Sequence, residues 1–178
     1  MRITAVFFIS FALFACAYQP PQGKWIRLDA ESLYLEAVVL DKNTMSTNYK
    51  NVCVEAGEEI QKQLSEELPA RVQPLQFYPA QTPPQEGPSA NIQILITDCK
   101  VDVEQWGAGG GGGAFTYYLD LDVKVLVSYK GSTLLSYNIK ISDQVDTDIP
   151  DPLFEFSFEE PVVRILLLFD GRRLLVPD

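Results

Sequence analysis

The amino-acid sequence predicts an α+β fold, a mainly antiparallel sheet with one long and one short helix packed on one face as a two-layer sandwich. Residues 115–129 and 135–141 alternate apolar and polar side chains on either side of a short turn, which is typical of a β-hairpin. Residues 48–68 place apolar side chains at helical spacing on one face. This pattern predicts a long amphipathic helix that ends at Pro69.

The short helix is predicted over residues 162–169. Glu159-Glu160-Pro161 brings carboxylates and a proline to its first turn, and Asp170-Gly171 is a typical stop. The apolar residues that remain in the tail 172–178 are expected to pack back on the body.

Three further segments complete the predicted sheet. Residues 33–40 are a nearly continuous apolar run, which indicates a first strand. Residues 72–78 predict a second strand, which Pro74 restricts to an edge or a bulge. Residues 91–106 alternate in two opposite phases, so we expect a β-bulge near Thr97-Asp98 that brings both apolar sets to one face.

The first sixteen residues have the layout of an exported protein. Met1-Arg2 is followed by an apolar run that is too short to span a membrane, as in a secretory signal peptide. Leu13, Ala15 and Cys16 resemble the lipobox of bacterial lipoproteins, and the resemblance implies that Cys16 becomes the lipid-modified N-terminus. The alternative is an ordinary signal peptide with Cys16 as a chance thiol.

These features divide the chain into three parts. Residues 1–15 are the predicted signal peptide, 16–24 the lipidated cysteine with a proline-containing tether, and 25–178 a single periplasmic domain. Because Ala17 is not the aspartate of an inner-membrane retention signal, the resemblance implies an outer-membrane anchor, with palmitate among its acyl chains and the body facing the periplasm.

The other two cysteines form an even pair. In an oxidising compartment we expect a disulfide between Cys53 and Cys99, which the bulge turns toward the long helix. The alternative is two buried free thiols.

The charge of the chain limits its partners. The formal net charge is −10, which argues against nucleic acid and against electrostatic capture of anionic lipid headgroups.

The glycine-rich run 107–114 lacks the lysine of a phosphate-binding loop and precedes a strand. It is either a flexible tip between two strands or a contact loop, because aromatic residues flank it. The candidate docking residues are Trp106, Gly109, Gly110, Gly111, Gly112, Gly113, Phe115, Tyr117 and Tyr118.

The sequence offers no catalytic site. The absence of histidine excludes histidine-based triads and most zinc sites. Residues 143–152 form an acidic connector with four aspartates, whose spacing does not match a calcium loop, and a solvated loop is expected instead. We therefore predict no metal, no cofactor and no enzymatic activity.

The order of elements, together with Leu13 to Cys16, resembles small outer-membrane lipoproteins that assist envelope machines. The LptE family of lipopolysaccharide-assembly lipoproteins is nearest in layout, and CsgG-like curli-secretion and penicillin-binding-protein-activator lipoproteins are related. The resemblance implies an accessory or scaffold subunit that docks on an outer-membrane or periplasmic protein complex. The alternatives are a carrier of lipid or small hydrophobic ligands, with a cavity between helix and sheet, and an activator of a cell-wall enzyme.

Overall fold

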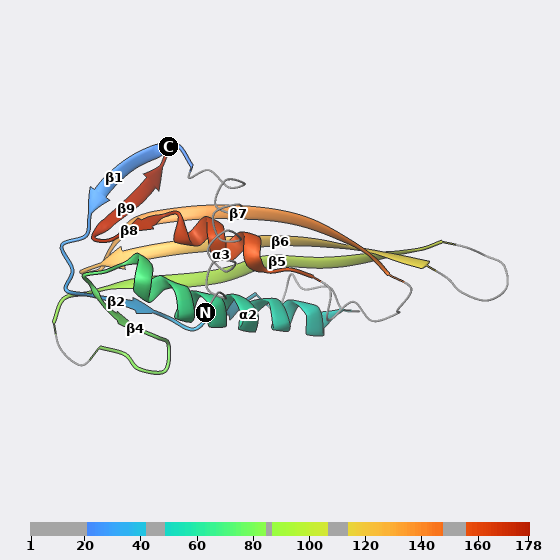
Figure 1. Cartoon of the computed structure of the whole chain (residues 1–178), viewed down its shortest axis with the longest axis horizontal. Coiled ribbons are helices and arrows are strands. Elements are labelled where there is room, and N and C mark those ends of the chain that lie inside the picture. Colours follow the sequence, from blue (N-terminus) through green and yellow to red (C-terminus); the bar gives the residue numbers. More distant parts are fainter. Residues whose placement is uncertain (1–20, 42–48, 85–86, 107–113, 148–155) are drawn as a thin grey trace, which may run out of the picture.

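The computed structural model describes residues 21–41, 49–84, 87–106, 114–147 and 156–178, and it confirms the α+β class. A long helix, α2 (Lys50–Arg71), and a short one, α3 (Glu159–Leu166), contact each other and lie on the same face of the main sheet (Figure 1). Cys16 and residues 109–113 lie outside the described residues.

Six strands form the main sheet. Their order is β4-β2-β5-β6-β7, and the short strand β3 lies beside β5. The long strands β5, β6 and β7 pair antiparallel with their neighbours. Strand β2 pairs in parallel with both β4 and β5, and β3 pairs in parallel with β5, so the sheet is mixed. The bounds are β2 (Ser32–Leu35), β3 (Val39–Leu40), β4 (Gln76–Tyr78), β5 (Ser89–Trp106), β6 (Ala114–Tyr129) and β7 (Ser132–Thr147).

The predicted bulge is confirmed. The register of β5 against β6 shifts between Ile96 and Asp98, so residues on both sides of the shift that face the helices are apolar. Without it, Cys99 would lie on the face of the sheet opposite α2. The bulge therefore determines which of the alternating residues after Asp98 face the helices and become part of the core.

The first predicted strand is two strands. The chain leaves the sheet between β2 and β3, where the backbone N–H of Val38 donates to the side-chain oxygen of Gln61 at 2.8 Å. The side chain of Gln61 thus takes the place of a neighbouring strand as the hydrogen-bond partner of this backbone N–H. The apolar pattern of residues 33–40 gives no sign of this interruption.

The long helix extends beyond its predicted end. Pro69 lies inside α2, which continues to Arg71, and the N–H of Val72 donates to the carbonyl of Leu68 at 3.0 Å. Proline in the last turn removes only its own N–H donor, so the following residues can still close the helix.

Two segments near the C-terminus differ from prediction. Residues 143–147 belong to β7 and are not part of a loop, because their register against β6 continues to Phe115↔Thr147. The short helix ends at Leu166, and the fully buried Phe169 opens strand β8 (Phe169–Asp170).

A second, three-stranded sheet has the order β1-β9-β8, with β1 (Gly23–Arg27) antiparallel to β9 (Arg173–Pro177). Gly23 and Lys24, which the sequence assigned to the tether, belong to β1 and pair with β9. The tail does return to the body, as a strand. The described chain starts beside its own C-terminus, where the N–H of Asp178 donates to the carbonyl of Gln22 at 3.2 Å, on the side of the molecule away from the free ends of β5 and β6 (Figure 1).

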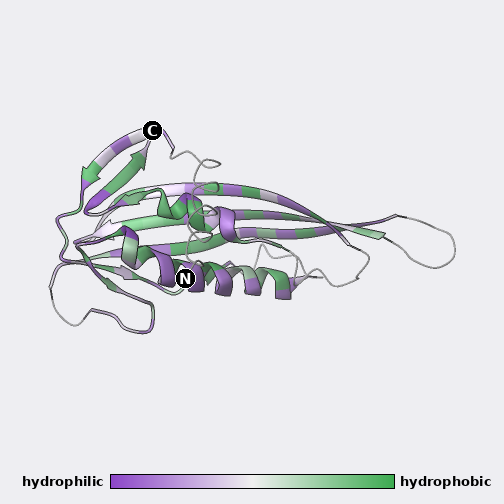
Figure 2. Ribbon diagram, viewed as in Figure 1, coloured by the Kyte–Doolittle hydropathy of each residue, from purple (hydrophilic) through white to green (hydrophobic). Residues whose placement is uncertain are grey.

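The core lies between α2, α3 and the sheet. Apolar and polar residues alternate along the long strands in Figure 2, and the apolar ones facing the helices are buried. The helix approaches the sheet closely at Gly57, where a Cβ would lie 2.9 Å from Cδ1 of Leu40. A larger residue there would displace the helix from the sheet.

Candidate docking surface

The long strands extend beyond the helices as a three-stranded ribbon (Figure 1). We call residues 98–106 of β5, 114–122 of β6 and 140–147 of β7 the distal arm. With 18 residues at about 3.3 Å each, β5 spans about 60 Å and ends at the tip of the arm.

The tip carries an exposed tryptophan held by a hydrogen-bond relay. Trp106 is 59% exposed, and its indole N–H donates to Oγ1 of Thr116 at 3.1 Å. The hydroxyl of Thr116 donates in turn to Oδ1 of Asp146 at 2.8 Å. Thr116 is buried, so one residue on each of the three strands helps to fix the orientation of the indole ring.

The face of the arm that turns away from the helices is acidic. The arm holds seven carboxylates and two lysines, which leaves a net charge of −5. The carboxylates are Asp98, Asp102, Glu104, Asp120, Asp122, Asp143 and Asp146, and all of them except Asp143 lie on this face.

The electrostatics of the arm follow from this composition. A hydrogen bond to Asp98 at 2.5 Å, followed by the nearby charges of Asp98, Asp120 and Asp122, raises the pKa of Lys100. Desolvation, and then the charge and hydrogen bond of Glu104 at 3.3 Å, raise the pKa of Tyr118. A cationic partner surface would be attracted to this face.

The predicted aromatic residues separate into two groups. Trp106 and Tyr118 lie on the acidic face, whereas Tyr117 points to the helix side and is 1% exposed. Its ring meets Tyr49 edge to face, with centroids 6.0 Å apart, and Phe115 at 6.2 Å. Tyr117 therefore supports the arm from within and offers no contact surface. Its alternation with Leu119 and Leu121 was the sequence signal for this.

Thr116 and Asp146 were missed by the sequence analysis. They lie 30 positions apart and meet only because β6 and β7 pair in this register. No motif marks such a pair before the register is known.

A disulfide joins Cys53 in the first turn of α2 to Cys99 just after the bulge in β5. Its S–S distance is 2.07 Å and its Cα–Cα distance 5.9 Å. The bridge ties the start of the helix to the sheet where the arm begins.

Within the described ranges, no group of three or more His, Cys, Asp or Glu side chains is arranged to hold a metal ion. Of the four aspartates in the acidic connector, Asp148 and Asp151 lie outside these ranges. No helix within the described ranges is long and apolar enough to cross a membrane.

No family model matches the sequence, and no curated protein sequence matches it. The chain is similar in structure to a homologue of neuraminyllactose-binding hemagglutinin from Helicobacter pylori, with 12% identity over 84% of this chain and 83% of that chain, at a TM-score of 0.37. It is also similar to a minor lipoprotein from Acinetobacter baumannii, with 14% identity over 79% of this chain and 84% of that chain, at a TM-score of 0.33. One distant neighbour is thus a bacterial lipoprotein. TM-scores this low assign no function, and the likeness to LptE and CsgG stays a prediction.

Proposed function

We propose that the protein is a lipid-anchored accessory subunit, held in the outer membrane through Cys16, that docks on a periplasmic or outer-membrane protein complex through the distal arm. The role is non-catalytic: the arm positions or stabilises the partner. The partner surface is basic and contains a pocket for an indole ring.

The observation that carries this proposal is the fixed, exposed indole of Trp106 at the tip of the arm. Tryptophan is enriched among the residues that dominate binding energy at interfaces. A ring already held by Thr116 and Asp146 loses less conformational entropy on binding than a free one. The end of β5 also projects away from the small sheet in which the described chain begins (Figure 1), so a tether at that sheet leaves the tip accessible.

The close contact between α2 and the sheet favours docking over ligand carriage. A carrier needs a space of several hundred Å³ between these layers. At Gly57 even one added methyl group would approach Leu40 to 2.9 Å, and the disulfide holds the same helix against β5. This part of the interface has no room for a lipid chain.

Site-specific photo-crosslinking in native envelopes tests the docking role. A photo-reactive amino acid at Glu104, exposed on the same face of β5 as Trp106, should give a discrete adduct that disappears when Trp106→Ala is added. The same amino acid at Ser136, exposed on the part of β7 far from the tip, is the matched control. Equal adducts at both positions, or an adduct unaffected by Trp106→Ala, would contradict docking through the tip.

The anchor is tested separately. Metabolic labelling with palmitate should mark the wild-type protein and not the Cys16→Ser variant, whose other two cysteines are joined in the disulfide. Palmitate incorporation that persists in Cys16→Ser would refute Cys16 as the lipidated residue.

A further inference from the structure

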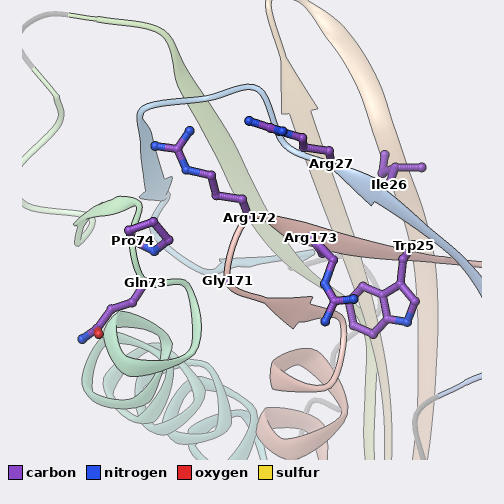
Figure 3. A pocket seen from close by; sticks show the side chains of 8 residues that line it. All are labelled: Trp25, Ile26, Arg27, Gln73, Pro74, Gly171, Arg172 and Arg173. Atoms are coloured by element: carbon purple, nitrogen blue, oxygen red, sulfur yellow. The ribbon is translucent and has the colours of Figure 1, made fainter.

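The end of the molecule opposite the arm carries an open pocket of about 580 Å³ (Figure 3). It lies between β1, the segment that follows α2, and the turn between β8 and β9. Three arginines line it, Arg27, Arg172 and Arg173, together with the apolar side chains of Trp25, Ile26 and Pro74.

Backbone contacts hold the walls of this pocket together. Gly171 has a φ of +58°, and a Cβ there would lie 2.9 Å from the carbonyl oxygen of Gln73. Its N–H donates to the carbonyl of Arg71 at 2.9 Å, and the N–H of Leu28 donates to the carbonyl of Arg172 at 2.7 Å. The turn must therefore carry glycine at 171 to sit against the end of α2.

The three guanidinium groups differ in their present partners. Arg27 pairs with Asp29 at 3.3 Å, and both side chains are more than 70% exposed. Arg173 pairs with Asp170 and lies over the ring of Trp25, 5.3 Å from its centroid. Arg172 forms no ion pair with any residue that the structure describes. Exposed ion pairs contribute little, so these arginines can turn to a stronger anion.

We propose that this pocket binds the phosphate of anionic phospholipid headgroups in the membrane that holds the anchor. Guanidinium groups bind phosphate through two parallel hydrogen bonds. Trp25, 38% exposed beside them, is of the type that settles at the boundary between headgroups and acyl chains. Apolar walls next to three arginines fit a lipid surface better than a free ion.

The position of the pocket supports this occupant. The proposal rests on the anchor at Cys16, from which Gly23, the first residue of β1, is only seven residues away. That length of chain spans at most about 25 Å. The pocket is thus held near the membrane surface, where even weak headgroup binding acts at high effective concentration.

The net charge of −10 does not oppose this binding. The carboxylates of the arm begin at Asp98, nine residues or about 30 Å along β5 from its first residue, which is beyond the screening length of about 8–10 Å at physiological salt. What a headgroup meets is the local set of arginines, of which Arg172 has no ion pair among the described residues while Arg27 and Arg173 are held only by the exposed pairs with Asp29 and Asp170. Their engagement would orient the body so that the arm points away from the membrane.

Vesicle binding tests the proposal with the chain from Ala17 onward, exported behind a cleavable signal peptide so that it carries no acyl group. Vesicles of phosphatidylcholine mixed with phosphatidylglycerol should bind this chain. The Arg27→Gln/Arg172→Gln variant should bind about 25-fold more weakly, or about fivefold for each basic residue removed near an anionic surface. The matched control, Lys100→Gln/Lys140→Gln, changes the net charge equally on the arm and should retain wild-type binding.

Trp25 reports the site directly. In a Trp106→Phe background, its fluorescence should shift to shorter wavelength with the mixed vesicles and stay unchanged with phosphatidylcholine alone. The melting temperature of each variant checks that the fold is retained.

Three results would overturn the proposal: equal weakening by the arginine and lysine pairs, equal binding to both vesicle types, or a Trp25 response to inorganic phosphate at matched ionic strength but none to vesicles. The last result would assign the pocket to free phosphate. None of these depends on acylation or on crosslinking at Glu104, so failure here is distinguishable from failure of the proposed function.

Discussion

The distal arm and the end of the molecule that holds the three-stranded sheet differ in charge and in how far the helices cover them. The arm has seven carboxylates against two lysines, and its outer part is a single layer of strands beyond the helices, whereas three arginines line one pocket at the other end. The net charge of −10 is thus a sum that conceals two unlike surfaces. Whole-chain charge therefore says little about what either end binds.

The difference in coverage by the helices can be followed along the single strand β5. Ile94 in β5 is fully buried under the helices, while Val103, nine residues further along β5, is 41% exposed. The same strand therefore serves as core at one end and as a projecting surface at the other.

The largest expected effect on stability comes from a substitution in the buried part of β5. Ile94→Ala should lower the free energy of unfolding by about 3–4 kcal/mol, because it removes buried methylene groups and leaves a cavity. Val103→Ala, the control on the same strand, should change it by less than about 0.5 kcal/mol. Urea denaturation followed by circular dichroism measures both, and similar losses would show that the arm is part of the core.

The disulfide marks the border between the two regions. Replacing both cysteines, as Cys53→Ala/Cys99→Ala, should lower the free energy of unfolding by about 2–4 kcal/mol, because the unfolded chain regains the freedom of a long loop. Denaturation of the oxidised wild type and of the variant gives the difference. If the reduced wild type is as stable as the oxidised one, the loss in the variant comes from packing and not from the bridge.

A smaller effect is expected at the tip. Thr116→Val keeps the shape of the side chain but removes the hydroxyl between Trp106 and Asp146, which should cost about 1 kcal/mol. In a Trp25→Phe background, the fluorescence anisotropy of Trp106 should fall as the ring gains freedom. Thr133→Val, at an exposed position of β7, is the control. Unchanged anisotropy would mean that the relay does not hold the indole.

The smallest effect on stability is expected at Glu67, which lies on the exposed side of α2. Desolvation, and then the charges of Glu159 and Glu66, raise the pKa of Glu67 above its ordinary value of 4.5. The wild type therefore loses stability as pH rises through this raised pKa, since charging Glu67 is harder in the folded than in the unfolded state.

Glu67→Gln removes that loss. At pH 7 the variant should be more stable than wild type by a few tenths of a kcal/mol, since the site is largely exposed and screened. The gain should shrink to nothing as the pH falls below the ordinary glutamate value. Thermal denaturation across this range measures it, with Glu58→Gln on the same helix as the control. A gain independent of pH would point to helix propensity instead.

The sequence predicted those features of the fold that depend on residues close to one another in the chain. The hairpin of β6 and β7, the α+β class and the bulge before Cys99 all follow from apolar alternation read over about ten positions. The pairing of β1 with β9 was missed, because it joins Gly23 to Pro177 and neither segment alternates clearly. Its consequence, the arginine pocket, was missed with it.

The same limit applies to the candidate docking site. The sequence singled out Trp106, but Thr116 and Asp146 became its partners only once the register of three strands was known. Tyr117 was placed at the docking loop through its nearness in sequence, whereas strand periodicity already assigned it to the core. Where these two signals disagree in a strand, periodicity is the better guide.

Strand β7 forms one edge of the six-stranded sheet, and within the described residues no strand pairs with its outer side. Asp143 occupies a position on the core face of this edge, opposite the buried Leu119, while Lys140 and Asp146 occupy the other face. An added strand would bury the carboxylate of Asp143 without a cation to match it, which discourages edge-to-edge growth. Under the proposed anchoring at Cys16, copies crowded together in the plane of a membrane would therefore remain separate, each with its own arm free.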